Sequence, residues 1–341
     1  MKKLLTILFI LVTTGALSQD IHLSQFTSTP LMRNPALAGI FTGHFRVNIA
    51  HRDQWGWAGF PYRTTALSAE YKFSIGESED YLTAGLQAFH DDAGTMHLTT
   101  TQVMPALNYH KLISSEHNRY ISAGFMVGFA QRKFDMNNLT FGSQYTNGSY
   151  SPSNPSGETM WLQNRTFLDA AVGLSYNSNF GEYGNWYVGA SAYHINRPKQ
   201  NFSEEEIQLD PKFQFNAGLH HTVSEQWDFY AEANALSQGS YREYILGGMI
   251  TTDLRYMVEA VDERNQRVSA GIGLYYRYND AFVPVAKFIY ENIEAGFSYD
   301  VNTSRLKAAS RGKGAFELTI SYRGFFGERG GMMQQSRCPA F

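Results

Sequence analysis

Cysteine is almost absent from this 341-residue chain, which contains only Cys338. A single thiol forms no internal disulfide and no thiolate metal cluster, so both kinds of cross-link are excluded. Long apolar runs are also scarce: beyond the first 18 residues, none approaches the roughly 20 residues of a membrane-spanning helix. An excess of one charge is missing too. The 28 Lys and Arg residues nearly balance 31 Asp and Glu residues, so nucleic acid is not expected as a partner.

The first 18 residues have the pattern of an export signal. Lys2 and Lys3 precede an apolar stretch over 4–12, and Ala16 and Ser18 supply small residues at the expected cleavage site. We therefore expect a signal peptide over 1–18 that is cleaved after Ser18. No cysteine lies near the cut, so a lipoprotein anchor is not expected.

Aromatic residues and glycine, in contrast, are abundant. The chain has 24 Phe, 21 Tyr and 30 Gly residues. Segments of about ten residues alternate apolar and polar side chains and are separated by Gly, Asn, Asp and Ser. In one of them, Leu168 and Val172 share one face while Asp169 and Gly173 share the other. This period of two predicts β-strands.

The content of the two faces favours a barrel over a soluble sandwich. One face is aliphatic and aromatic, and the other is rich in Gly, Ser, Ala and Thr with scattered charges. A charge facing lipid costs roughly 2–4 kcal/mol at mid-bilayer, which explains why charges avoid the apolar face. The sequence thus predicts an all-β fold, a single transmembrane β-barrel of about 14 antiparallel strands with short periplasmic turns and longer extracellular loops. The predicted strands lie near 44–52, 64–73, 81–90, 99–111, 119–131, 166–178, 185–195, 212–223, 227–237, 241–251, 267–278, 281–290, 291–301 and 314–323.

The domain division follows from these strands. Residues 19–43 are expected to form an N-terminal periplasmic or plug-like segment, 44–323 the outer-membrane barrel and 324–341 a C-terminal tail. Residues 252–266 are long for a periplasmic turn and leave room for another strand.

No pattern predicts a catalytic, cofactor-binding or metal site. The ten histidines lack the spacing of a zinc site, and the adjacent His220 and His221 point to opposite faces of a strand. A G-x-S-x-G elbow is missing as well. We therefore expect no cofactor and no enzyme activity.

Several stretches resemble a known family. Gln25-Phe26, Asn34-Pro35-Ala36-Leu37-Ala38-Gly39 and Arg52-Asp53-Gln54-Trp55 are similar to the opening motifs of the PorP/SprF proteins of the type IX secretion system of the Bacteroidota. Leu139 to Tyr145 resembles their mid-chain loop, 297–304 and 314–318 their closing motif, and 338–341 their common ending. The motif positions are Asn34, Pro35, Ala36, Gly39, Gln54, Trp55, Phe141, Gly142, Tyr145, Tyr299, Asp300, Asn302 and Ser304.

This resemblance implies an outer-membrane barrel with a protein partner. Family members support secretion or surface attachment of particular type IX substrates, often large adhesins, or link periplasmic parts of the machinery to the membrane. A solute-conducting, porin-like barrel remains an alternative, and a barrel hydrolase is a third.

The loop over 302–313 adds a basic cluster to this picture. It could fold inward and meet lumenal carboxylates, or remain an ordinary solvated loop. The candidate contacts are Glu294, Arg305, Lys307, Arg311 and Lys313.

Overall fold

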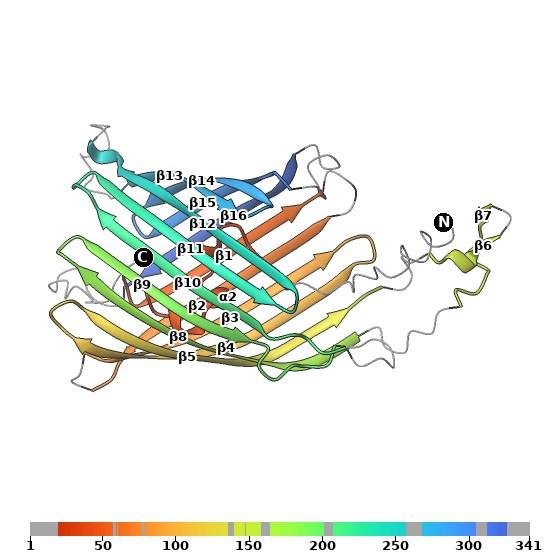
Figure 1. The fold of residues 1–341 in the computed structure, drawn as a ribbon, viewed down its shortest axis with the longest axis horizontal. Coiled ribbons are helices and arrows are strands. Elements are labelled where there is room, and N and C mark those ends of the chain that lie inside the picture. Colours follow the sequence, from red (N-terminus) through yellow and green to blue (C-terminus); the bar gives the residue numbers. More distant parts are fainter. Residues whose placement is uncertain are drawn as a thin grey trace, which may run out of the picture.

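The computed structural model describes residues 20–56, 59, 61–76, 79–135, 140–146, 148–157, 164–200, 207–256, 268–304 and 312–325. The expected signal peptide, Arg305, Lys307, Arg311 and Cys338 therefore lie outside the described residues, as do 257–267 of the long turn. Within the described part, one sheet closes on itself by pairing the first strand with the last (Figure 1).

Fourteen antiparallel strands form the closed barrel, and each pairs with its neighbours along the chain except at the closing seam. Their bounds are β1 (Phe45–Gln54), β2 (Tyr62–Ser74), β3 (Tyr81–Ala93), β4 (Leu98–Ser114), β5 (Arg119–Lys133), β8 (Asn164–Phe180), β9 (Gly184–Tyr193), β10 (Lys212–Thr222), β11 (Trp227–Gln238), β12 (Tyr241–Asp253), β13 (Val268–Arg277), β14 (Ala281–Tyr290), β15 (Ile293–Asn302) and β16 (Lys313–Gly324). The predicted fold class is confirmed.

The barrel has apolar side chains on its outer surface and polar side chains inside, the reverse of a soluble protein. Phe129 and Leu174 point outward and are 64% and 59% exposed, whereas Asn108 and Asp169 point inward and are fully buried. A contiguous apolar outer surface of this kind suits lipid rather than water. Among the described residues, no helix is long and apolar enough to cross a membrane.

Pro105 sits within β4, where it has no N–H to donate to a neighbour. The register between β4 and β5 continues unshifted past this point, but the pairs at 104 and 105 are missing from the ladder. A barrel strand therefore accommodates this proline without a bulge.

The two ends of the barrel differ, as predicted. Long connections, including 134–163 and 194–211, leave one end, here called the loop end. Short turns, such as 181–183 and 291–292, lie at the other, the turn end. The 254–267 connection is the exception: its described part begins with a 3-10 helix, η6 (Leu254–Tyr256), and not with a strand.

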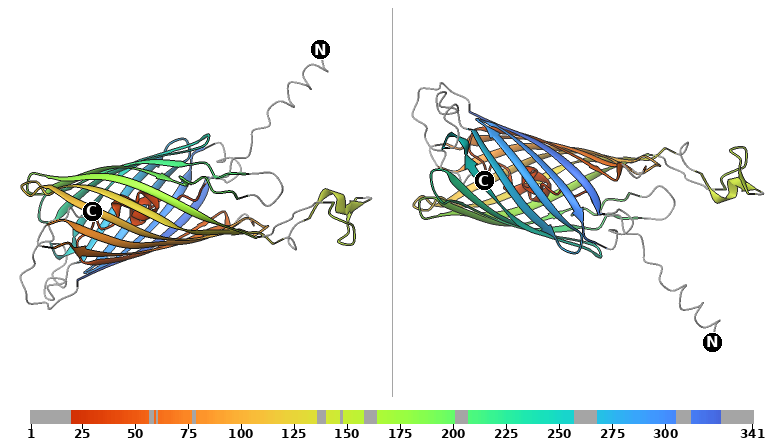
Figure 2. Two further views of the ribbon diagram at one scale, coloured as in Figure 1. Left: turned by 90° about the horizontal axis from the view of Figure 1, so that it is seen from below. Right: turned by 90° about the horizontal axis from the view of Figure 1, so that it is seen from above.

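The longest connection also carries structure that the alternation did not predict. A 3-10 helix, η5 (Gly142–Gln144), leads into a small hairpin of β6 (Tyr145–Thr146) and β7 (Ser149–Tyr150). In Figure 2 this hairpin projects well beyond the barrel.

The N-terminal segment, residues 20–44, lies inside the barrel (Figure 2). Asp20 contacts Gln238 and Lys212 at the loop end, whereas His44 bonds to Gly324 at the turn end. The segment therefore runs through the whole lumen before β1 begins. We call it the plug.

Cysteine labelling tests the predicted orientation in the membrane. In a Cys338→Ser background, Tyr145→Cys on the hairpin and Tyr183→Cys in the β8–β9 turn are matched in exposure, at 56% and 59%. Since the loop end is expected outside, a membrane-impermeant maleimide should label Tyr145→Cys in intact cells. Tyr183→Cys should react only after the outer membrane is permeabilised. The reverse pattern would mean that the barrel is inserted the other way.

Candidate functional site: the plug and its lumenal docking surface

Two prolines shape the plug into short helical turns. These are η1 (Phe26–Ser28), α2 (Pro30–Arg33) and η2 (Pro35–Leu37), with Pro30 and Pro35 at first positions, where a missing N–H costs nothing. Asn34 caps the last turn by accepting a hydrogen bond from the Ala36 N–H at 2.8 Å. The side chains that fill the lumen, Leu31, Ala36, Ala38 and Phe41, are fully buried.

Asn34 joins the plug to three consecutive barrel strands. Its amide nitrogen donates to the Leu174 carbonyl on β8 at 3.1 Å and to the Ala190 carbonyl on β9 at 3.3 Å. It also donates to Asn216 Oδ1 on β10 at 3.0 Å. Because one side chain both accepts from the plug and donates to the wall, neither Asp nor Leu could replace it without leaving buried polar groups unpaired.

Glycines in the wall give Asn34 and Pro35 their space. A Cβ at Gly173 would collide with Asn34 Oδ1, one at Gly124 with the Pro35 backbone, and one at Gly189 with the Asn34 amide nitrogen. These glycines lie on β8, β5 and β9. The small-residue face predicted from the sequence is therefore a docking surface for the plug.

The second half of the motif is held by polar side chains from β4, β3 and β2, the strands that continue the sheet beyond β5. Asn108 donates to the carbonyls of Ala36 and Ala38 at 2.9 and 2.8 Å. Gly39, at φ +84°, packs against Thr83, and its N–H donates to Glu70 Oε2 at 2.8 Å. A side chain at Gly39 would strain the backbone and collide with Thr83, which explains the glycine at this motif position.

A buried ion cluster, which we call the anchor, holds the start of the plug. Arg52 on β1 bonds to Glu317 Oε1 on β16 at 2.5 Å and to Asp300 Oδ2 on β15 at 2.9 Å. Arg277 on β13 also bonds to Asp300, at 2.7 Å. Two guanidinium groups thus balance two carboxylates, and all four side chains are at most 4% exposed.

The plug completes this anchor with its own polar groups. Glu317 accepts the backbone N–H groups of Ser24 and Gln25 at 2.6 and 2.8 Å. The Ser24 hydroxyl accepts from Arg52 at 2.9 Å and from Arg277 at 2.8 Å. The plug therefore adds four hydrogen bonds to charges that the barrel strands already pair.

Near the loop end, a second charged cluster contacts Asp20. Its carboxylate bonds to Lys212 and lies 3.4 Å from His194 Nε2, while His194 Nδ1 bonds to Asp169 at 2.9 Å. This cluster ties the start of the plug to the loop end of the barrel.

The predicted motif positions fall into two groups. Asn34, Pro35, Ala36, Gly39 and Asp300 belong to the plug and its anchor. Gln54 borders this group, since its Oε1 accepts from Arg52 at 3.1 Å.

The other motif positions lie elsewhere. Trp55 directly follows β1 and packs edge-on against Tyr62, and Tyr299 faces outward. Asn302 donates to the Lys313 carbonyl at 3.1 Å, and the Ser304 N–H donates to the Asp280 carbonyl at 3.1 Å. Phe141, Gly142 and Tyr145 form the η5 turn and the hairpin, away from the lumen.

Glu294 has ion-pair partners other than the basic loop. It lies at the turn end and pairs with Lys287 at 2.6 Å and Arg323 at 3.1 Å. The described ends of the 302–313 connection, at Asn302 and Lys313, lie at the opposite end of β15 and β16, a strand length of roughly 30 Å away. Lys313 begins β16 as an exposed residue.

Sequence reasoning also missed several residues of the site. Glu70, Asn108, Asn216 and Arg277 are all buried and contact the plug or the anchor. Each is a polar or charged residue on the small-residue face of a predicted strand, which marks it as lumenal but not as a plug contact.

Comparison with known proteins agrees with the motifs. The family model of the type IX secretion system membrane protein PorP/SprF matches residues 16–322. The chain belongs to the PorP/SprF family. The family predicted from the motifs is thus confirmed, and the chain is a membrane barrel associated with the type IX secretion system. No curated protein sequence matches it.

Solved structures similar to this PorP/SprF barrel include a NanC porin, with a TM-score of 0.40, 9% identity and coverage of 82% of this chain and 99% of that chain. The TodX monoaromatic hydrocarbon channel deltaS2 mutant has a TM-score of 0.44, 10% identity and coverage of 86% and 93%. CdiB from Acinetobacter baumannii has a TM-score of 0.44, 7% identity and coverage of 82% and 60%.

Removing Arg52 tests the anchor of this PorP/SprF protein. Arg52→Met leaves Glu317 and Asp300 buried with fewer partners, which should cost about 3–5 kcal/mol of unfolding free energy. Denaturant unfolding in detergent micelles measures the loss. The control is Arg63→Met, which breaks an ion pair of a 56% exposed Arg63 side chain with Asp53 and should cost at most about 1 kcal/mol. Equal losses in the two variants would contradict the anchor's role.

Filling the glycine surface tests plug docking. Gly173→Val should displace Asn34 from the lumen, and purified protein in planar bilayers should then conduct more ions than the parent barrel. Gly142→Ala is the control, because a Cβ there meets no atom within 4 Å. Unchanged conductance for Gly173→Val in a correctly folded barrel would show that this contact does not close the lumen.

Proposed function

We propose that this PorP/SprF barrel is a non-enzymatic outer-membrane component that supports secretion or surface anchoring of one secreted type IX substrate, a large surface protein. The observation that carries the proposal is the plug, which occupies the lumen from the loop end to the turn end. A barrel closed in this way acts through its surfaces and not through an open pore. Periplasmic parts of the secretion machinery are the second class of expected partner.

The plug also argues against the porin-like alternative. A solute channel needs a continuous aqueous path, whereas Leu31, Ala36 and Phe41 of the plug are fully buried within this lumen. Polar groups around these side chains form hydrogen bonds with one another, such as Asn34 with Asn216 and Ser24 with Arg277. Conductance of the unmodified barrel is therefore expected to be low.

The hydrolase alternative gains little from the lumenal histidines. Ser122 Oγ lies 2.7 Å from His110 Nδ1, which is the spacing of a nucleophile and a base. Both side chains are almost completely buried, and the His110 ring stacks on Tyr81 at 3.9 Å. Asn108 and Thr83 lie within 3.3 Å of the other ring nitrogen, so a substrate has no access to this pair.

The loop end offers a surface for the secreted partner. Its hairpin presents Tyr145 and Tyr150, which are 56% and 42% exposed with ring centroids 5.5 Å apart. Exposed tyrosines are frequent anchors in protein interfaces. The family motif at Phe141 and Gly142 shapes the turn that holds this pair, which gives the motif a role in presenting the hairpin.

Gene deletion with complementation tests the function. Surface biotinylation of the deletion strain should show loss of one or a few type IX substrates, restored by the full chain. A hairpin variant with Tyr145→Ser and Tyr150→Ser should insert normally but restore less surface protein. Tyr183→Ser at the turn end is the control and should restore it fully. An unchanged surface proteome in the deletion strain would refute the proposal, whereas loss of every type IX substrate would assign the protein to the general machinery.

A further inference from the structure

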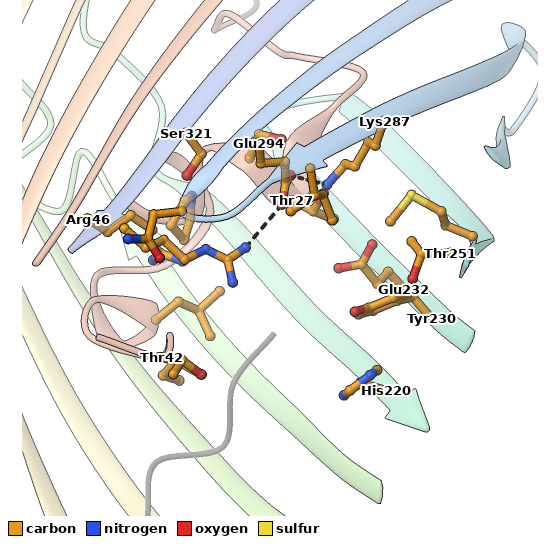
Figure 3. Close-up of a pocket in the computed structure, with 18 of the residues that line it drawn as sticks. Thr27, Thr42, Arg46, His220, Tyr230, Glu232, Thr251, Lys287, Glu294 and Ser321 are labelled. Atoms are coloured by element: carbon orange, nitrogen blue, oxygen red, sulfur yellow. Dashed lines mark hydrogen bonds and ion pairs between the residues drawn. The ribbon is translucent and has the colours of Figure 1, made fainter. Parts of the chain in front are cut away.

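A cavity of about 630 Å³ lies beside the plug at the turn end of the barrel (Figure 3). The plug forms one wall, and β1, β9 to β12 and β14 to β16 contribute the others. Its lining includes Glu291 and Asn292 of the β14–β15 turn, so the cavity is reached from that end. The volume falls within the range of ligand-binding pockets, roughly 300–1,000 Å³.

The cavity has a surplus of positive charge. Lys287 and Arg323 share a single carboxylate, that of Glu294 (Figure 3). Arg46 pairs with Glu70, which lies outside the cavity lining. Glu232 lies on another wall and accepts a hydrogen bond from the Tyr275 hydroxyl at 2.7 Å. Among the side chains that line the cavity, four cations face three carboxylates: Arg33, Arg46, Lys287 and Arg323 against Glu232, Glu291 and Glu294.

Arg33 is the cation without an acidic partner. It is 6% exposed, and no carboxylate among the described residues lies within ion-pair distance of it. Its Nη1 donates to the Tyr187 hydroxyl at 2.9 Å, while its buried Nε has no hydrogen-bond partner. A buried guanidinium usually has an anion beside it, because an unpaired charge in a low-dielectric site is costly.

A second unsatisfied group lines the same cavity. The Ser28 hydroxyl is buried and has no hydrogen-bond partner in the structure. Buried polar atoms are rarely left unpaired, so two of them beside one cavity indicate a ligand with polar groups. Apolar side chains also line the space, among them Leu37, Ile40, Met249 and Ile289.

We propose that this cavity binds a short acidic peptide segment, with its carboxylate paired to the Arg33 guanidinium. The planar guanidinium matches a carboxylate through two parallel hydrogen bonds. Ser28 is placed to bond a peptide amide, and the apolar wall accepts a neighbouring aliphatic side chain. The peptide's source in a secretion partner rests on the proposed function, but the ligand chemistry rests on the cavity alone.

Calorimetric titration of the purified full-length barrel in nanodiscs tests this assignment. The probes are a capped pentapeptide with one glutamate and one leucine, the same peptide with glutamine in place of glutamate, and inorganic phosphate. The glutamate peptide should bind at least tenfold more tightly than the glutamine peptide. Arg33→Gln should remove that tenfold preference, whereas Arg242→Gln, at the loop end of the barrel, should keep it.

A second variant covers the case in which Arg33→Gln disturbs the plug. Ile289→Trp enlarges a side chain of the cavity wall on β14, and it should abolish binding of both peptides while the barrel keeps its heat-dependent gel mobility. Equal affinity for the two peptides would overturn the proposal, as would unchanged binding to Arg33→Gln. Binding of inorganic phosphate with no binding of the acidic peptide would also overturn it. Since no cells are involved, a negative result here leaves the secretion test unaffected.

Discussion

The buried contact between Arg52, Glu317 and the backbone of Ser24 and Gln25 is the interaction on which the rest of this molecule depends. Arg52 and Glu317 face each other across the seam where β1 closes onto β16. The carboxylate that pairs with Arg52 also receives the N–H groups of the plug. Barrel closure and plug docking therefore share one carboxylate, and each contact leaves fewer buried polar groups for the other to satisfy.

This coupling explains why the lumen is so polar. Its inward side chains would serve poorly as the core of a water-soluble protein, since many are charged or amides. The plug makes few backbone hydrogen bonds within itself, and the lumenal side chains supply the partners that water would otherwise provide. Tyr193, Ser191 and Gln214 bond to carbonyls of α2, and Asn108 and Ser175 to those that follow. The wall thus supplies the partners that a helix or sheet would otherwise provide.

The strands were predictable and the plug contacts were not, for a physical reason. A strand shows its period of two within ten residues, so strands as different as 119–131 and 314–323 were found within about two residues of their observed ends. The anchor instead joins residues far apart in the sequence, such as Arg52 and Glu317, and alternation shows only that each faces the lumen. The β6–β7 hairpin was missed because two-residue strands are too short to show any period.

The family motifs supplied part of what the alternation lacked. Asn34, Asp300 and Gly39 were singled out with no assigned role, and all three prove to be plug or anchor residues. Arg277 and Asn108 lie outside the quoted motifs and were missed, although they contact the same groups. Residues 16–322 match the family as a whole. A motif, however, gives only the residue type at each position. A plug contact also depends on a second residue, which lies on another strand.

The connection from Asn34 extends beyond the residues that touch the plug. Asn216 accepts from Asn34, and its own amide donates to Asn234 Oδ1 on β11 at 2.7 Å. The orientation of each amide thus fixes that of the next, since an amide that flips would set donor against donor. A plug displaced from Gly173 would leave Asn216 without its donor and loosen β10 and β11, which border the cavity containing Arg33. The state of the plug and the shape of that cavity are therefore linked through a row of three asparagines.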